Sequence, residues 1–260
     1  GEKNLQVLID YASLMLGWLK EVSYSSLDIP MLNDSTYNIA PSTKDLFDYA
    51  DRLGVHFGKI NLNESGYRKI KRLNYECILD IGNVQAEYIP GHTHADTFNF
   101  EVRVGGRPFI VDSGIGTYES NSKRHIERST KSHNTVEIMN VNSSEVWGGF
   151  RVGNRAIVSK IKEDNNEISA THNGYLRRFN ILHTRKWDFK DDYIVIKDSL
   201  SNSSKAKFYI HFHPSVNILT IKRVVDTYNV DYKIQDYQYS LGFNNYTTAK
   251  KIVVFFDKSL

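Results

Sequence analysis

Hydrophobic residues recur at helical spacing in the first part of the chain. The apolar positions three and four residues apart are Leu5, Leu8, Ile9, Ala12, Met15, Leu16 and Leu19. They predict one amphipathic helix over about residues 4–20. Ser42 with Asp45 predicts the capped start of a second helix, which runs to Leu53 and stops at Gly54. Two helices of this size cannot form a core alone, so we expect a partner in the β region or in further helices.

After Gly66 the hydrophobic period changes from helical spacing to two. Residues 67–79 read as strand-like. Further on, Phe98, Phe100, Val102 and Val104 alternate with polar residues. Gly105-Gly106 then predicts a two-residue hairpin turn, followed by a return strand that ends at Asp112. This segment is the clearest β-hairpin of the chain.

Strand-like runs continue to the end of the chain, separated by clusters of Asn, Ser, Gly and Asp. They cover residues 133–139, 155–161, 168–172, 182–189, 193–198, 206–213, 216–223, 229–234 and 252–256. Many short strands at this spacing predict a mainly β chain built as a large antiparallel β-sandwich. The 16 Tyr and 13 Phe agree with a strand-rich fold.

Composition excludes several classes of protein. The net charge is +3 and no basic run occurs, so we expect no nucleic-acid partner. No apolar run is long enough to span a bilayer. The single cysteine, Cys77, cannot form an internal disulfide, and its place in an apolar strand predicts a buried bystander. The chain begins without Met or a signal-peptide pattern, so we expect targeting information upstream.

The candidate chemistry is concentrated in Gly91-His-Thr-His-Ala-Asp96. Imidazole and carboxylate are ligands for zinc-like ions, but a lone His-x-His is more often part of a solvent-exposed loop. Asp112 is either a turn residue or a ligand carried on a strand end. The hairpin register pairs Asn99 with Asp112, so His94 can approach Asp112 only if the His-rich loop folds back over the sheet.

Two further polar groups have alternative interpretations. Arg124 and Arg128 lie in a basic turn that is either solvated or an anion clamp, since guanidinium groups bind carboxylate or sulfate with two hydrogen bonds. His211 and His213 lie on one predicted strand, and we expect them to face solvent or a cleft rather than a metal.

Several motifs in fixed order resemble the C-terminal β-sandwich region of the heparinase II/III-like polysaccharide lyases. The matching segments are Gly91 to Phe100, Gly106 to Gly114, Tyr118, and Arg128 to Val136. The loop around Pro30 to Asp34 and its flanking helices resemble the last turns of the (α/α) toroid that precedes the sandwich in this family. The resemblance implies a helical segment, residues 1–58, as the end of such a toroid, and a sandwich over residues 59–260.

The resemblance also implies a reaction and a set of roles. The family cleaves uronate-containing polysaccharides, including glycosaminoglycans, by β-elimination. His92 and Tyr118 match active-site residues, and His94, Asp112 and His133 match ligands of one structural zinc-like ion. Because His94 is two residues from His92, a metal on His94 would position His92. The residues assigned to substrate binding are Asn33, Asp34, Arg124, Arg128 and Asn134.

The family's principal base and its group that neutralises the substrate carboxylate come from the toroid. We therefore expect an N-terminal toroid domain outside this chain, and we expect the chain alone to be inactive. One alternative is a non-catalytic carbohydrate-binding or structural sandwich in polysaccharide metabolism or capsule assembly. A metal hydrolase is a third alternative, but no helical His motif with a general-base Glu supports it. A periplasmic, cell-surface or secreted location is expected for the lyase, and a cytoplasmic one is the alternative.

Overall fold

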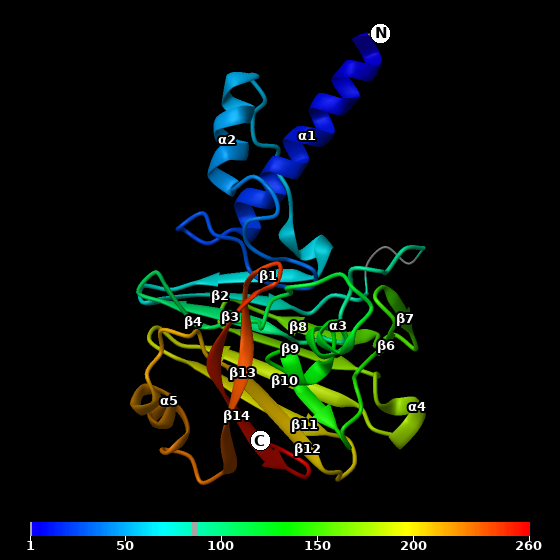
Figure 1. Cartoon of the computed structure of the whole chain (residues 1–260), viewed down its shortest axis with the longest axis vertical. Coiled ribbons are helices and arrows are strands. Elements are labelled where there is room, and N and C mark those ends of the chain that lie inside the picture. The colour runs from blue at the N-terminus through cyan, green and yellow to red at the C-terminus, as the bar shows by residue number, and fades with distance from the viewer. Residues whose placement is uncertain (1, 85–87) are drawn as a thin grey trace.

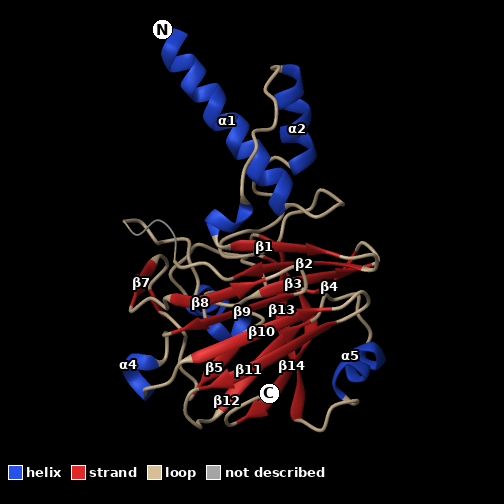
Figure 2. Ribbon diagram, turned by 180° about the vertical axis from the view of Figure 1, so that it is seen from behind, coloured by secondary structure: helices blue, strands red, loops and turns tan. Residues whose placement is uncertain are grey.

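Helices and strands occupy separate parts of the chain (Figure 1). The computed structural model describes residues 2–84 and 88–260. The helices are α1 (Glu2–Val22), α2 (Thr43–Arg52), α3 (Ser122–Glu127), α4 (Leu176–Phe179) and α5 (Ile218–Val225), with short 3-10 turns at Leu62–Ser65 and Thr130–Ser132. Helices α1 and α2 project away from the sheets, and α4 and α5 lie at opposite sides of the strands (Figures 1 and 2).

The strands form three four-stranded sheets and one hairpin, and all described pairings are antiparallel. One sheet contains β1 (Tyr67–Lys71), β2 (Tyr75–Asp80), β3 (Phe100–Val104) and β4 (Arg107–Ile110) in that order. A second contains β11 (Ile194–Leu200), β10 (His183–Phe189), β9 (Glu167–His172) and β8 (Val158–Glu163). The third contains β13 (Asp231–Gly242), β14 (Asn245–Phe256), β12 (Ala206–His211) and β5 (Val136–Ile138), and β6 (Glu145–Trp147) pairs with β7 (Arg151–Gly153).

One hydrophobic core joins the three larger sheets. Leu79 and Phe100 from the first sheet, Trp187 from the second and Ile252 from the third are fully buried in the same cluster. The chain is therefore mainly β, an antiparallel β-sandwich preceded by a helical segment. Among the described residues no helix has the length and apolar character needed to cross a membrane.

Local signals predicted several elements correctly. Ser42 and Asp45 form both halves of the capping box of α2. Gly105 and Gly106 have φ angles of 56° and 76°, as a two-residue turn with two left-handed positions requires, and Val104 pairs with Arg107 across it. Cys77 is fully buried, as predicted.

The strand predicted over residues 216–223 is wrong, because this segment is helix α5. Asn217 caps the helix by accepting a hydrogen bond from the Thr220 N–H, and Ile221 and Val225 are buried four residues apart. The β-branched Val and Ile residues favour a strand, but the cap and the four-residue burial period determine the structure.

Candidate active site and metal centre

The His-rich loop folds back over the first sheet. The Ala95 N–H donates to the Arg128 carbonyl, the Thr130 hydroxyl donates to the Ala95 carbonyl, and the Asn99 N–H donates to the Asp96 carbonyl. These bonds place the loop beside the segment that carries His133, and the His94 and His133 rings lie 5.3 Å apart between centroids. The fold-back that the hairpin register demanded is therefore present.

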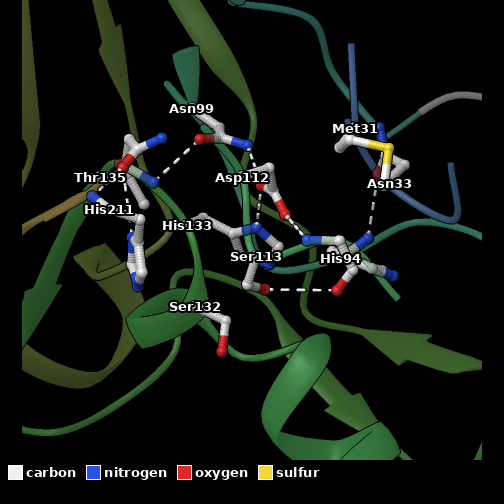
Figure 3. Close-up of polar contacts among 12 residues, drawn as sticks. Met31, Asn33, His94, Asn99, Asp112, Ser113, Ser132, His133, Thr135 and His211 are labelled. Atoms are coloured by element: carbon white, nitrogen blue, oxygen red, sulfur yellow. Dashed lines mark hydrogen bonds and ion pairs between the residues drawn. The ribbon is translucent and has the colours of Figure 1, made fainter. Parts of the chain in front are cut away.

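Asp112 follows the return strand β4 by two residues and lies next to His133 (Figure 3). Its Oδ2 accepts from the Asn99 amide and lies 2.7 Å from His133 Nδ1, while its Oδ1 accepts from the Gly114 N–H. Asp112 and its three partners, Asn99, Gly114 and His133, are all buried. Burial alone lowers the pKa of His133, but the carboxyl groups of Asp112, Asp96 and Asp80 together more than offset burial, so the pKa of His133 is raised.

His94 is held from a different side, by the loop that joins α1 and α2. Its backbone N–H donates to the Asn33 side-chain oxygen at 3.1 Å (Figure 3). Its Nε2 lies 2.8 Å from Asp34 Oδ1. Burial lowers the pKa of His94. His94 Nδ1 and His133 Nε2 are both buried and have no hydrogen-bond partner within the described part of the chain.

Buried polar atoms ordinarily have partners, and an unpartnered imidazole nitrogen is an atom that a zinc-like ion can bind. The predicted set is only partly assembled, since both Asp112 oxygens already accept hydrogen bonds. No group of three or more His, Cys, Asp or Glu side chains among the described residues is arranged to hold a metal ion. The metal assignment of His94, Asp112 and His133 therefore stays a prediction.

His92 is the exposed member of the pair, with 68% of its side chain accessible. Its Nδ1 lies 2.8 Å from Asp34 Oδ2, and its ring contacts Tyr118 and Phe150, each with a centroid separation of 5.9 Å. Burial, followed by the Asp34 charge, raises the pKa of the partly exposed Tyr118. The structure thus brings the two predicted catalytic side chains together at the surface.

Asp34 joins the exposed and buried parts of this site. Besides the two histidines, it receives both terminal nitrogens of Arg124, at 2.5 and 2.8 Å, and its side chain is only 5% accessible. Burial by itself would raise the pKa of Asp34, but the hydrogen bonds from His94 and Arg124 hold it below the ordinary range. The structure therefore gives Asp34 and Arg124 internal partners instead of an open position for substrate.

The other residues assigned to substrate binding also have structural contacts. Arg128 is buried and donates to the carbonyls of Thr93, Gly148 and Arg151. Asn134 is buried and donates to the carbonyls of Phe100 and Val111. Asn33 donates to the Tyr67 hydroxyl and accepts from His94. These three side chains therefore have partners within the chain, and their assignment to substrate binding stays a prediction.

His211, expected to face solvent or a cleft, is fully buried. Its N–H donates to Asn134 Oδ1, and its ring lies against Tyr237 with centroids 4.7 Å apart. Residues to which the sequence assigned no role form a second buried network. His183 lies between His172 and Asp198, at 2.9 and 2.6 Å, and Arg185 pairs with both Asp198 oxygens at 2.8 Å. No local sequence motif predicts this network, because its members come from three different strands.

Comparison with known proteins adds a family and a fold. The family described as "Heparinase II/III-like, C-terminal" matches residues 57–250. No curated protein sequence gives a significant match. The structure of the heparan sulfate lyase HepC from Pedobacter heparinus is similar to this chain, with 15% sequence identity and a TM-score of 0.66. The matched region covers 93% of this chain and 44% of the HepC chain. A heparinase III gene product has 16% sequence identity and a TM-score of 0.64. The matched region covers 92% of this chain and 42% of that protein's chain. The chain thus spans less than half the length of these proteins.

Proposed function

Because the chain belongs to the heparinase II/III-like family through its C-terminal region, we propose that it forms the β-sandwich part of a polysaccharide lyase. The substrate we propose is an acidic, uronate-containing polysaccharide, cleaved by β-elimination. The observation that carries this proposal is the exposed His92 ring, held beside Tyr118 by the buried Asp34. An exposed proton-transfer group on a rigid support is what such a reaction requires.

The reaction removes the proton from C5 of the uronate, breaks the C4–O4 bond and protonates the leaving O4. An imidazole ring has one nitrogen that can accept a proton and one that can donate, so His92 suits either proton transfer. Tyr118 has a raised pKa and stays protonated at neutral pH, which makes it a hydrogen-bond or proton donor toward O4 and not a resting base. Phe150 packs against both rings and limits their motion.

The reaction also needs a group that neutralises the substrate carboxylate, because this makes the C5 proton acidic. Arg124 is occupied by Asp34, and Arg128 by backbone carbonyls. We therefore propose that this group and a further base lie on a helical domain outside the 260 residues, and that the chain alone has little activity. Coverage of only 42–44% of the two lyase-related structures supports this proposal.

The test compares the 260-residue chain with the protein as encoded in full, on a panel of uronate polysaccharides. Unsaturated uronate ends are followed by ultraviolet absorbance. We expect product from the full protein, and its loss in His92→Ala with the fold intact. Polysaccharide binding with unchanged polymer length would instead support the non-catalytic carbohydrate-binding alternative. Absence of both product and binding on every polymer would contradict the proposal.

We also propose that His94 and His133, with Asp112, hold one divalent ion of the zinc type. The support is the pair of unpartnered ring nitrogens and the adjacent carboxylate. When bound, such an ion would cross-link the His-rich loop to the segment carrying His133 and so keep His92 in place. Elemental analysis should find about one ion per chain, reduced in His94→Ala and Asp112→Ala but retained in His92→Ala. Full occupancy in the first two variants would contradict the assignment.

A periplasmic, cell-surface or secreted location is part of the same proposal, because a long charged polysaccharide does not cross a membrane unaided. Cell fractionation of the source organism with an antibody to this chain is the direct test. Recovery only in the cytoplasmic fraction would favour the cytoplasmic alternative.

A further inference from the structure

One carboxylate holds two histidines that are two residues apart in the sequence. Asp34 Oδ2 lies 2.8 Å from Nδ1 of His92, and Asp34 Oδ1 lies 2.8 Å from Nε2 of His94. The two rings therefore present different nitrogens to the same carboxylate. Asp34 reaches them from the loop between α1 and α2, about 60 residues earlier in the chain.

The identity of the contacting nitrogens decides where each ring carries its proton. Arg124 pairs with both Asp34 oxygens, and this geometry belongs to an ionised carboxylate. An ionised carboxylate only accepts hydrogen bonds, so both contacting ring nitrogens must carry a proton. A neutral His92 then has its proton on Nδ1 and a free lone pair on Nε2. A neutral His94 has the opposite arrangement, with its free lone pair on Nδ1.

Each free lone pair matches the surroundings of its ring. The His92 ring is exposed beside Tyr118, whereas His94 Nδ1 is buried, has no partner among the described residues, and belongs to the ring that lies against His133. We propose that Asp34 is a positioning residue that sets opposite tautomers in His92 and His94. It thereby prepares one ring for proton exchange with a polysaccharide and the other for a buried metal ion. The purpose of the two tautomers rests on the proposed function, but the tautomers themselves do not.

This role differs from direct contact with substrate. Asp34 has 5% side-chain accessibility, and both of its oxygens are occupied by three protein side chains. Its loop is fixed as well, because Asn33 receives the His94 N–H and Arg124 donates its Nε to the Gly149 carbonyl. Carboxylates that orient metal-binding or catalytic histidines in this way act through the ring that they hold.

The wild-type chain provides the first test. Nitrogen-15 spectra of the histidine rings, recorded without metal at about pH 8 where ordinary imidazoles are neutral, distinguish the two tautomers. We expect the proton on Nδ1 of His92 and on Nε2 of His94, with signals assigned through His92→Gln and His94→Gln. The same tautomer in both rings would overturn the proposal without any variant of Asp34.

The second test uses Asp34→Asn, which keeps the shape of the side chain but offers only one acceptor oxygen. One ring at most can keep its wild-type bond, so the signals of at least one ring should move toward the other tautomer. Asp48→Asn, on the exposed side of α2, is the matched control and should change neither ring. Unchanged tautomers in a folded Asp34→Asn chain would show that Asp34 has only a structural role.

A zinc titration separates this inference from the proposed function. If His94 binds zinc through Nδ1, Asp34→Asn should weaken zinc binding by roughly 10- to 100-fold, and Asp48→Asn should not. Unchanged zinc affinity in Asp34→Asn would overturn the His94 half of the proposal. Absence of lyase activity in the protein as encoded in full, or of zinc binding in the wild-type chain, would contradict the proposed function. The expected tautomers in the wild-type chain would still leave the positioning role standing.

Discussion

Glu101 is a buried carboxyl that connects three separate segments of the chain. It lies on β3 and accepts hydrogen bonds from the Tyr24 hydroxyl, the Met31 N–H and the Asp112 N–H. Tyr24 and Met31 belong to the loop after α1, and Asp112 belongs to the candidate metal centre. This single side chain therefore fixes the position of the α1–α2 loop, and with it Asp34, relative to the sandwich.

Glu101 should make the stability of the chain depend on pH. Burial raises its pKa to about 7, whereas an unfolded glutamate ionises near pH 4.5. The stabilisation from protonated Glu101 is fully present below pH 4.5 and is lost as the pH rises through 7. The free energy of unfolding should fall by about 3 kcal/mol over this range. Glu101→Gln mimics the protonated carboxyl and should lack this loss. Urea unfolding of the metal-free chain at pH 4.5 and at pH 7 measures this loss of stability. Glu119→Gln, at an exposed position, is the control. Equal pH dependence in wild type and Glu101→Gln would contradict the prediction.

Asn134 was assigned to substrate binding from the sequence, but its buried contacts predict an effect on stability. Its amide joins the carbonyls of Phe100 and Val111 to the His211 N–H. Asn134→Ala leaves these backbone groups unpaired and should lower the free energy of unfolding by about 3 kcal/mol. Exposed Asn229→Ala should change it by less than about 0.5 kcal/mol. Normal stability in Asn134→Ala, measured by urea unfolding, would show that the amide is not a necessary cross-link.

At the scale of elements, caps and turns determine where helices and strands begin and end. The Ser42–Asp45 box starts α2, the Gly105–Gly106 turn joins β3 to β4, and Asn217 starts α5. Each of these features involves residues within a few positions of one another. The hairpin matters for the site, because its return strand β4 ends two residues before Asp112.

The N-cap of α5 can be tested separately from the rest of the fold. Asn217→Ala removes the side chain that accepts the Thr220 N–H, and should destabilise the helix by about 1 kcal/mol. Amide hydrogen exchange over residues 218–225 should become several-fold faster, while exchange in β10 stays unchanged. Asn229→Ala, beyond the end of the helix, serves as the control. Faster exchange throughout the chain would indicate that the cap supports the whole domain and not the helix alone.

At the scale of the whole molecule, α1 extends away from the sandwich (Figures 1 and 2). It also carries several exposed apolar side chains. Leu8, Tyr11 and Met15 are 66%, 64% and 70% exposed. Contiguous exposed apolar surface of this kind marks an interaction site. It agrees with the expectation that the two N-terminal helices need a partner.

This surface predicts concentration-dependent association of the 260-residue chain. The double variant Leu8→Glu with Met15→Glu should reduce it at least several-fold, because charges oppose burial of the helix surface, with no loss of thermal stability. Light scattering over a concentration series is the measurement, and Lys44→Glu on exposed α2 is the control. A chain that stays monomeric at every concentration would contradict the prediction.

Local patterns in the sequence determined most of the elements. Alternating apolar residues predicted the strands of the hairpin, and the capping box and double glycine placed their helix and turn, because these signals depend on residues close in sequence. The ordered motifs from Gly91 to Val136 also indicated the family. The sequence further grouped His92, His94, Asp112 and His133 as one candidate site, and the structure brings His94 and His133 to ring contact.

Only the tertiary structure decided which side chains those residues contact. Asp34 meets His92, His94 and Arg124 from distances of 58, 60 and 90 residues along the chain. Neither these pairings nor the burial of Asn134 can be read from spacing, because the path of the chain between elements sets them. For the same reason, Asp34 looked like a residue that could contact substrate. In the folded chain it is a buried carboxylate whose partners are the two histidines of the motif.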